Sequence, residues 1–442
     1  MLLKFWGTRG SIPSPIKPDQ VKSKLISALK QAGQEQLDLT DPQIVEAFVA
    51  KLALAGSTVG SNTTCVTIEL EDELIIFDAG SGIRELGEAL MDRKSDFAQK
   101  FSFYHGKGHA FLFFTHTHWD HIQGLPFFRP MNVEGNVFDI YHIHAHVPTV
   151  LAQQMEYQTF PLQFDQLDAT LNFHQIAVGQ QVTIAEATVT NIELNHPGKA
   201  YAYRVAADDA VAILATDGEY TSLDYADTKK YRDFYANADA LIFDAMFSVR
   251  ESFIKEDWGH SSALIGVDLA RVSGVKRLFL FHHDPTSTDT EIMQVLQETR
   301  EYLGLDEPLE VLVAQEGMEA YLDNSARSVN FSLNDEVAGD VILISLSGKF
   351  GPHVTDQFRK HLAYSLRTHQ TNKVVLKMEN LNELTMAGIR ALVDARKSVM
   401  SLALVGVPEK LYRVIELSGT TDFFAIYADE AAALAALNAH SK

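Results

Sequence analysis

The sequence predicts an α/β protein made of a layered α/β domain followed by a smaller α/β domain. Apolar runs of strand type alternate with helical stretches from residue 64 to about residue 322, an order that is typical of layered α/β domains. A polar stretch begins at Asp323, and a second series of strands and helices follows it. The 442 residues, of which 46% are hydrophobic, suffice for two cores. We therefore expect a first domain at 1–322, a linker at 323–332 and a second domain at 333–442.

Residues 17–57 interrupt the early strands and predict an inserted pair of helices. Apolar residues recur at helical spacing from Val21 to Leu29, and Asp41-Pro42 resembles an N-cap followed by proline at the first helical position. The pair could form a lid or dimer contact beside the active site. We favour the simpler alternative, a helical hairpin that packs on its own domain.

The most informative segment is residues 115–121, which read T-H-T-H-W-D-H and directly follow an apolar run. Imidazole and carboxylate are ligands of hydrolytic metals such as zinc. His116 and His118 are two apart on an extended segment, so they point to the same side, whereas Asp120 and His121 follow in a turn and could serve a second ion. The pattern H-x-H-x-D-H is specific, and it predicts a metal site rather than a solvated loop.

Three later residues, His196, Asp217 and His282, each stand where an apolar strand is expected to end. Taken singly, such a residue is more often part of a turn. In series behind the first motif, however, the three supply what a two-metal site still needs, including a carboxylate that can bridge the ions.

The order of these seven residues resembles the ligand order of the metallo-β-lactamase fold superfamily. The resemblance is closest to the phosphodiesterase branch, which includes ribonuclease Z, and it covers roughly residues 1–320. Segments 5–13, 60–65 and 77–82 also fit that branch. The implied fold is an αββα sandwich, two β-sheets packed face to face with helices outside and metal ions at one edge.

The resemblance implies two divalent metal ions and a role for each of the seven residues. The first ion is held by His116, His118 and His196, the second by Asp120, His121 and His282, and Asp217 bridges both. Asp78 would lie behind the ligands, where a carboxylate orients an imidazole; its simpler role is a turn residue ahead of glycine. Zinc is the expected metal, with manganese or iron as alternatives, because sites of this kind accept each of them.

The segment Gly259-His260-Ser261-Ser262 matches a G-H-S-[ST] motif of the same branch. Two cations generate a metal-bound hydroxide and neutralise a phosphoryl oxygen, while the leaving alkoxide benefits from a nearby imidazolium. The expected catalytic residues are therefore His260 at the leaving group and, at the metals, Asp120 and Asp217. The simpler alternative is that the serines only begin the helix expected over 263–273.

Two further features have a structural and a functional interpretation. His142, His144 and His146 alternate along an apparent strand and would line one face of it, and we expect a structural role because nothing supplies a carboxylate beside them. Arg9 follows the first strand, and either a substrate phosphate or a salt bridge could engage it.

The second domain is predicted as a compact sheet with helices on one side. The expected elements are strands at 341–346, 373–378 and 402–407, and helices at 354–368, at 387–400 and after residue 409. Over roughly residues 333–440 this order resembles a STAS domain of the anti-sigma-factor-antagonist type. The family's phosphorylated serine falls in a D-S-x-G pattern, where this chain has Thr385-Met386-Ala387-Gly388. Met386 has no hydroxyl and Thr385 is one position off, so we expect a docking or dimerising module rather than a phosphoswitch.

Composition narrows the partners and the location. The single cysteine, Cys65, excludes an intramolecular disulfide framework and a cysteine metal cluster. The formal charge of −21 works against long polyanions, so we expect a small phosphodiester and no large nucleic acid. Without a signal-peptide core or a run of roughly 18 apolar residues, we expect a cytoplasmic protein with no membrane partner.

The leading hypothesis is a dinuclear metal-dependent phosphodiesterase that acts on a small phosphodiester such as a cyclic nucleotide. The first alternative is a signalling adaptor or sensor whose STAS-like domain binds a regulatory partner or self-associates. The second alternative is a metal-dependent thioester hydrolase that uses the same metals.

Overall fold

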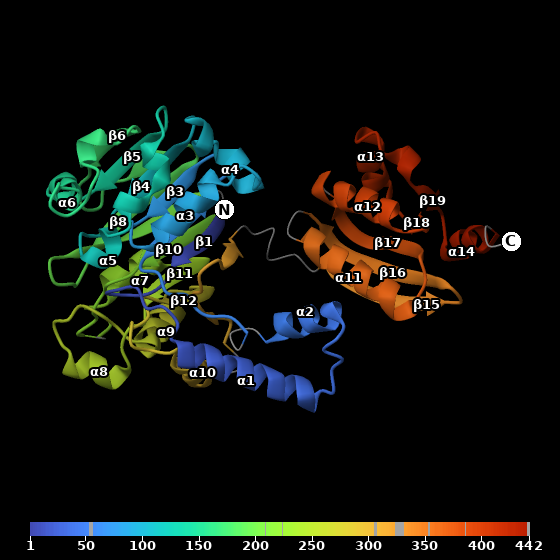
Figure 1. Ribbon diagram of the computed structural model, residues 1–442, viewed down its shortest axis with the longest axis horizontal. Helices are drawn as coiled ribbons and strands as arrows, with labels where there is room; N and C mark the ends of the chain where they lie inside the picture. Colours follow the sequence, from blue (N-terminus) through green and yellow to red (C-terminus); the bar gives the residue numbers. More distant parts are fainter. Residues whose placement is uncertain are drawn as a thin grey trace. The chain divides into compact units, whose positions relative to one another are not determined.

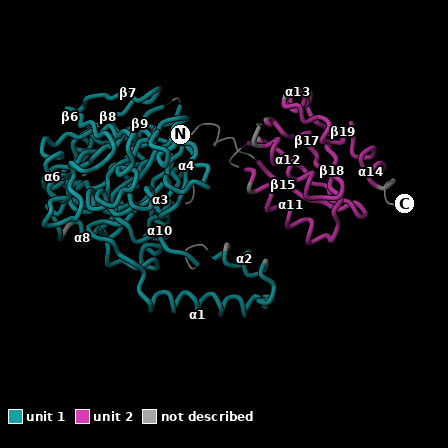
Figure 2. Tube along the Cα trace, turned by 45° about the horizontal axis from the view of Figure 1, so that its top comes forward, with its two compact units in different colours: residues 1–323 teal, residues 324–442 magenta. Residues whose placement is uncertain are grey.

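The computed structural model describes the chain except residues 53–55, 208, 223, 305–306, 323–330, 352–353, 385 and 440–442. The chain forms two compact units, Met1–Asp323 and Asn324–Lys442 (Figure 2). Most of the linker expected at 323–332 lies outside the described residues. Of the two that are described, Phe331 packs into the core of the second unit and Ser332 begins a strand.

The first unit contains two seven-stranded sheets. One sheet has the order β14-β1-β2-β3-β4-β5-β6 and the other has the order β13-β12-β11-β10-β9-β8-β7. The strands of the first sheet are β1 (Leu2–Gly7), β2 (Cys65–Glu69), β3 (Leu74–Phe77), β4 (His109–Phe113), β5 (Val137–His142), β6 (Thr170–Gln175) and β14 (Glu319–Tyr321). The strands of the second sheet are β7 (Val182–Ile184), β8 (Ala187–Leu194), β9 (Ala200–Ala207), β10 (Ala210–Ala215), β11 (Ala240–Asp244), β12 (Arg277–Phe281) and β13 (Glu310–Val313).

The inner faces of the two sheets form one hydrophobic core (Figure 1). Phe5 of β1 packs on Phe279 of β12 with ring centroids 5.4 Å apart, and Phe77 of β3 lies 5.7 Å from Tyr203 of β9. Helices cover both outer faces: α3 (Gly82–Met91) and α6 (Val147–Gln153) on one side, and α7 (Lys229–Tyr235), α9 (Ala263–Val272) and α10 (Asp289–Leu303) on the other. The prediction of an αββα sandwich is confirmed. The same unit contains the shorter helices α4 (Asp96–Phe101), α5 (Trp119–Ile122) and α8 (Val249–Ile254).

Each sheet is parallel in the part that leads to the candidate site. Strands β3 to β6 run parallel to one another, as do β10 to β13. The carboxyl ends of parallel strands meet at one edge of a sheet, where ligands bind in open α/β folds. Residues that follow β3, β4, β10, β11 and β12 are therefore collected at one edge of the sandwich.

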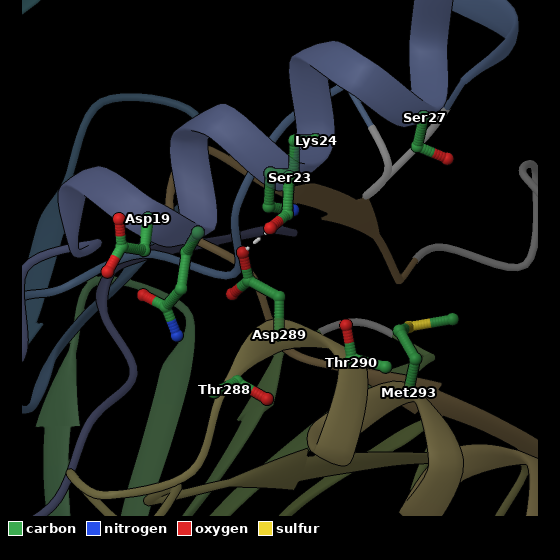
Figure 3. Close-up of a pocket in the computed structure, with 9 residues that line it drawn as sticks. Asp19, Ser23, Lys24, Ser27, Thr288, Asp289, Thr290 and Met293 are labelled. Carbon is green, nitrogen blue, oxygen red and sulfur yellow. Dashed lines mark ion pairs between the residues drawn. The ribbon is translucent and has the colours of Figure 1, made fainter. Parts of the chain in front are cut away.

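Two helices occupy the insertion expected at 17–57, α1 (Pro18–Gln34) and α2 (Pro42–Lys51). They share a small core of Ala32, Phe48 and Leu52. Figure 3 shows Lys24 of α1 paired with Asp289 at the start of α10, with Nζ 3.0 Å from Oδ2, beside a cavity of about 600 Å³. The apolar stripe of α1 is exposed, with Leu25 at 59%, so α1 meets α10 through polar contacts rather than through that stripe.

The second unit is a five-stranded sheet of order β15-β16-β17-β18-β19. Its elements are β15 (Ser332–Ala338), β16 (Val341–Phe350), α11 (Thr355–His369), β17 (Lys373–Leu384), α12 (Met386–Ser398), β18 (Ser401–Val405), α13 (Glu409–Leu417), β19 (Ala425–Tyr427) and α14 (Glu430–Ala439). The expected strands and helices are present, but β15, β19 and α14 were not predicted.

The expectation that helices cover one side of this sheet is wrong. Three helices, α11, α12 and α13, pack on the face that carries Ile342 and Ile344. The other face carries Val341 and Leu343, and it is covered by Ala433 and Leu437 of α14. Successive residues of a strand point to opposite faces, so the long apolar run of β16 supplies both cores. Thr385, the alternative phosphate acceptor, lies outside the described residues.

In the described part of the chain, no helix combines the length and the apolar composition that a membrane crossing requires.

Candidate metal centre

The structure brings all seven predicted ligands together at the carboxyl edge of the sandwich. They form two groups in which one nitrogen or oxygen of every residue lies within 4.8 Å of the others. The first group is His116, His118 and His196, and the second is Asp120, His121, Asp217 and His282. Within the first group His118 is exposed, whereas the other two are buried, so the site opens to solvent beside His118.

The carboxylate of Asp217 faces both groups. Its Oδ1 lies 3.9 Å from Nε2 of His116 and 3.9 Å from Nε2 of His196. On the other side, its Oδ2 lies 3.2 Å from Nε2 of His121, and its Oδ1 lies 3.4 Å from Nε2 of His282. This placement between two sets of imidazoles is the one that a bridging ligand requires.

Three strand ends share an unusual backbone conformation. Asp78 after β3, Asp217 after β10 and His282 after β12 have φ values of 58°, 57° and 57°, in the left-handed region that non-glycine residues seldom adopt. A residue in this region costs on the order of 1–2 kcal/mol, and such strain concentrates at functional sites. The conformation turns each side chain away from its strand direction toward the cluster.

Three buried imidazole nitrogens of the predicted ligands have no hydrogen-bond partner among the described residues: His116 Nε2, His121 Nε2 and His282 Nδ1. Buried polar atoms are nearly always paired. Two of these atoms, the Nε2 atoms of His116 and His121, point to Asp217. A donor set of imidazoles and carboxylates with unsatisfied nitrogens fits divalent ions such as zinc, so the residues present suit the group that the sequence predicts.

Asp78 holds His121 from behind. It is fully buried, its Oδ2 lies 2.8 Å from His121 Nδ1, and it accepts hydrogen bonds from the backbone N–H and the hydroxyl of Thr115, both at 2.8 Å. Because Asp78 engages Nδ1, Nε2 of His121 is directed to the cluster. Carboxylates commonly orient metal-binding histidines in this way. Burial raises the pKa of Asp78, against the opposing effect of His121.

The carboxylates also decide which imidazoles hold protons when no cation is present. Burial lowers the pKa of His116 well below its ordinary value. For His282 burial acts in the same direction, but Asp217 and Asp120 outweigh it and raise the pKa to about 9. The cluster thus attracts positive charge, which protons or divalent ions can supply.

Sequence reasoning missed Asp244, the last residue of β11. Its buried carboxylate accepts hydrogen bonds from the backbone N–H of Asp217 at 3.1 Å and of Met246 at 3.0 Å, and it lies 2.7 Å from Nδ1 of His260. The signal was available, because Asp244 follows the apolar run at 240–243 just as the predicted ligands follow their strands.

His260 lies beside the second group of ligands rather than within it. Its ring stacks on that of His282 at 5.1 Å and lies 5.4 Å from that of His196. Asp244 engages Nδ1, which leaves Nε2 to reach a bound molecule. Asp217, Asp244, His260 and His282 are also close enough to form a further metal-binding group. The helix expected here exists as well, since Ser262 caps α9.

Two glycines permit the close packing of the centre. A Cβ atom at Gly10 would overlap the ring of His282, and one at Gly259 would overlap the ring of His196. The backbone N–H of Ser11 donates to Asp120 Oδ2 at 2.7 Å. The loop after β1 therefore fixes one carboxylate and packs against one imidazole of the second group.

The structure decides between the two interpretations of Arg9. The side chain is buried and donates to the carbonyl oxygens of Gly60, Asp284 and Ser287 at 2.8–3.1 Å. Its Nη2 also lies 3.8 Å from Oδ1 of Asp289. The salt-bridge alternative is therefore confirmed, and Arg9 braces loops rather than facing a substrate phosphate.

The histidines at 142, 144 and 146 do not line one strand face, because β5 ends at His142. His144 contacts the carbonyl oxygen of Lys199 at 2.9 Å, and His146 contacts the hydroxyl of Thr117 at 3.0 Å. The expected structural role suits these contacts, which tie the turn to neighbouring loops.

Comparison with known proteins gives two family matches. Residues 74–283 match the beta-lactamase superfamily domain, and residues 332–433 match the STAS domain. Ribonuclease Z of Thermoplasma volcanium is 27% identical over 262 residues, which cover 51% of this chain and 82% of that protein. Ribonuclease Z of Picrophilus torridus is 22% identical over 286 residues, covering 53% of this chain and 84% of that protein.

Two solved structures are similar to parts of the chain. The metallo-beta-lactamase fold protein YhfI from Bacillus subtilis is 16% identical with a TM-score of 0.47, covering 72% of this chain and 98% of that chain. An anti-sigma factor antagonist from Mycobacterium paratuberculosis is 17% identical with a TM-score of 0.24, covering 25% of this chain and 95% of that chain.

Proposed function

We propose that the protein is a metal-dependent hydrolase that cleaves phosphodiester bonds at a dinuclear centre. The match of residues 74–283 to the beta-lactamase superfamily domain, with a STAS match at residues 332–433, supports this proposal. The observation that carries the proposal is the position of His260. A buried carboxylate holds this imidazole beside the predicted ligands, where it can reach a leaving group.

The seven residues of the two groups would hold the ions. His116, His118 and His196 would bind one, Asp120, His121 and His282 the other, and Asp217 both. Divalent ions bound here would activate water and offset charge on a phosphoryl group. We propose zinc, with manganese or iron as alternatives.

His260 would donate a proton to the departing oxygen. Asp244 accepts from Nδ1–H and so presents Nε2–H outward. Asp244 also fixes the backbone of Asp217, so one carboxylate aligns the proton donor with the bridging ligand.

For the substrate we propose a small phosphodiester such as a cyclic nucleotide. The formal charge of −21 disfavours a long polyanion. The similarity to ribonuclease Z makes RNA one alternative substrate. A thioester is a second alternative, in which a different type of bond is hydrolysed.

The STAS domain offers a surface for a protein partner or a second copy of the chain. In a sensor or adaptor role, the protein would use that surface, and the metal site would only stabilise the fold.

The test is hydrolysis of bis(p-nitrophenyl) phosphate by protein loaded with zinc and then with manganese, with His260→Ala as the comparison. We expect metal-dependent cleavage of this diester. Because p-nitrophenolate departs with little protonation, the loss of roughly 10²-fold or more in His260→Ala is expected for a diester with an alkyl leaving group, at unchanged metal content. Absence of cleavage by protein that binds about two ions per chain would refute the phosphodiesterase proposal and favour the thioester or adaptor alternative.

A further inference from the structure

Two of the three tryptophans in the chain are exposed next to the metal centre. Trp6 is buried, whereas Trp119 is 77% and Trp258 is 63% exposed. Large aromatic side chains contribute most to stability or binding when their surface is buried, and tryptophan is among the more buried residue types on average. Two exposed indoles at one functional site therefore suggest that a ligand covers them.

The backbones of both tryptophans border the open side of the site. Trp119 directly follows the exposed ligand His118 at the start of α5. Trp258 directly precedes Gly259, whose carbonyl oxygen contacts His196 Nδ1 at 2.9 Å. The rings of His118 and His196 are 4.9 Å apart. Trp119 is thus adjacent in sequence to His118, and Trp258 is adjacent to Gly259, which contacts His196.

Both indoles are carried by a fixed backbone. Glu219 accepts hydrogen bonds from the N–H groups of Asp257 and Gly259, both at 3.1 Å, and so holds the residues on either side of Trp258. The carbonyl oxygen of Trp119 accepts a hydrogen bond from Gln123 at 2.8 Å within the turn of α5. Aromatic surfaces held in this way bind with little loss of conformational freedom.

Aromatic contacts connect Trp258 to the proposed proton donor. Lys255 Nζ lies 5.8 Å from the ring centroid of Trp258 and 4.2 Å from that of Phe247. The ring of Phe247 in turn meets the ring of His260 edge to face at 5.4 Å. Lys255 and Phe247 therefore link Trp258 to His260 through a series of contacts.

We infer that Trp119 and Trp258 bind nucleobases on either side of the scissile phosphate, so that the substrate is a short nucleotide diester with unpaired bases. The inference rests on the proposed function and specifies its substrate class. Indole faces bind any base by stacking, without a basic groove for the backbone. This mode of binding suits a chain of charge −21, in which the ions rather than lysines and arginines would engage the phosphate.

The test compares two substrates with the same leaving group, thymidine 5′-(p-nitrophenyl phosphate) and methyl p-nitrophenyl phosphate. The measured quantity is the ratio of their kcat/KM values in metal-loaded protein. We expect Trp119→Ala or Trp258→Ala to lower this ratio by roughly 5- to 150-fold, the range for loss of one stacked base, mainly through KM. Phenylalanine at either position should restore most of it.

Tyr302→Ala is the matched control, because Tyr302 is also exposed, at 50%, but lies on α10 and bonds to Asp268. It should leave the ratio unchanged. If the ratio stays unchanged in both tryptophan variants, or if phenylalanine fails to restore it, the inference is wrong, even if both substrates are cleaved.

A second readout does not need activity. Thymidine 5′-monophosphate should quench the fluorescence of the exposed indoles in metal-loaded protein, ribose 5-phosphate should not, and the quenching should fall when the indole that stacks on the base is replaced in Trp119→Phe or Trp258→Phe. Buried Trp6 supplies the residual signal. Protein that cleaves neither substrate but shows this quenching would refute the proposed function and support base binding. Equal effects of the two compounds would overturn the inference.

Discussion

At the scale of single residues, one buried carboxylate joins the proposed proton donor to the predicted metal ligands. Asp244 contacts His260, the backbone of Asp217 and, at 3.8 Å, Nδ1 of His282. Removing its charge should loosen the orientation of the His260 ring without removing a predicted ligand.

We predict that Asp244→Asn lowers kcat by roughly 10- to 100-fold, the usual effect of removing a carboxylate behind an active-site imidazole. The loss should be larger for an alkyl leaving group than for p-nitrophenolate, which departs with little protonation. Steady-state kinetics with both types of diester measures the difference. An equal loss for both leaving groups would mean that Asp244 acts on the metals instead.

Metal affinity should depend on pH through the imidazoles. Asp217 and Asp120 raise the pKa of His282 to about 9, although burial opposes them. Below that pH a metal ion must displace a proton from His282, so the apparent affinity should rise as the pH increases toward about 9 and a proton should be released on binding. Calorimetric titration of zinc in two buffers of different ionisation enthalpy measures both. Affinity that falls between pH 6.5 and 8.5 would contradict this protonation state.

At the scale of elements, the predicted ligands lie on short loops that follow strands. These loops pack so closely that two positions have room only for glycine. The loop after β1 reaches the second group of ligands, where Ser11 donates to Asp120 and Gly10 lies against His282. A side chain at position 10 must displace either the loop or the ring.

We predict that Gly10→Ala lowers metal affinity by at least 10-fold, a loss comparable to that from disturbing groups behind metal ligands. Gly33→Ala is the matched control, because a Cβ there meets no atom within 4 Å and lies in α1. The control should be neutral or stabilised by up to about 1 kcal/mol. Chelator competition and thermal denaturation measure the two effects, and wild-type affinity in Gly10→Ala would refute the packing argument.

At the scale of the whole molecule, each unit has its own hydrophobic core. The first unit has the core between the sheets and the layers beneath its helices, and the second has a core on each face of its sheet. Units with separate cores can unfold independently. Metal binding should stabilise only the unit that contains the ligands.

We predict two thermal transitions, of which zinc raises one and leaves the other unchanged. Leu437→Ala should lower the zinc-independent transition, because Leu437 is a buried residue of α14 over the second sheet, and such a truncation costs about 2–5 kcal/mol. Scanning calorimetry with and without chelator measures the shifts. A single transition that responds both to zinc and to Leu437→Ala would show that the units unfold together.

The fold and the clustering of the predicted ligands were largely predictable, because both follow from local sequence patterns. Apolar runs set the strands, and His116, His118, Asp120 and His121 stand within one short motif. The helix after Asp41 begins at Pro42, as its capping pattern indicates. The assignment of metal ions to these residues remains a proposal.

What escaped prediction depends on contacts between distant segments. Arg9 is buried because the loops that contain Gly60 and Asp284 close over it, and His144, beyond the end of its predicted strand, contacts Lys199. The packing of α14 on the second face of its sheet likewise follows from partners in β16 and β18. None of these partners is adjacent in sequence.

The sequence by itself determined the chemistry of the side chains, their order and the alternation of strands and helices, because these follow from residue type and spacing. Only the tertiary structure decided that Asp244 connects His260 to the backbone of Asp217 and that the indoles of Trp119 and Trp258 stay exposed. Burial and hydrogen bonding are properties of the packed chain, in which residues tens of positions apart become neighbours.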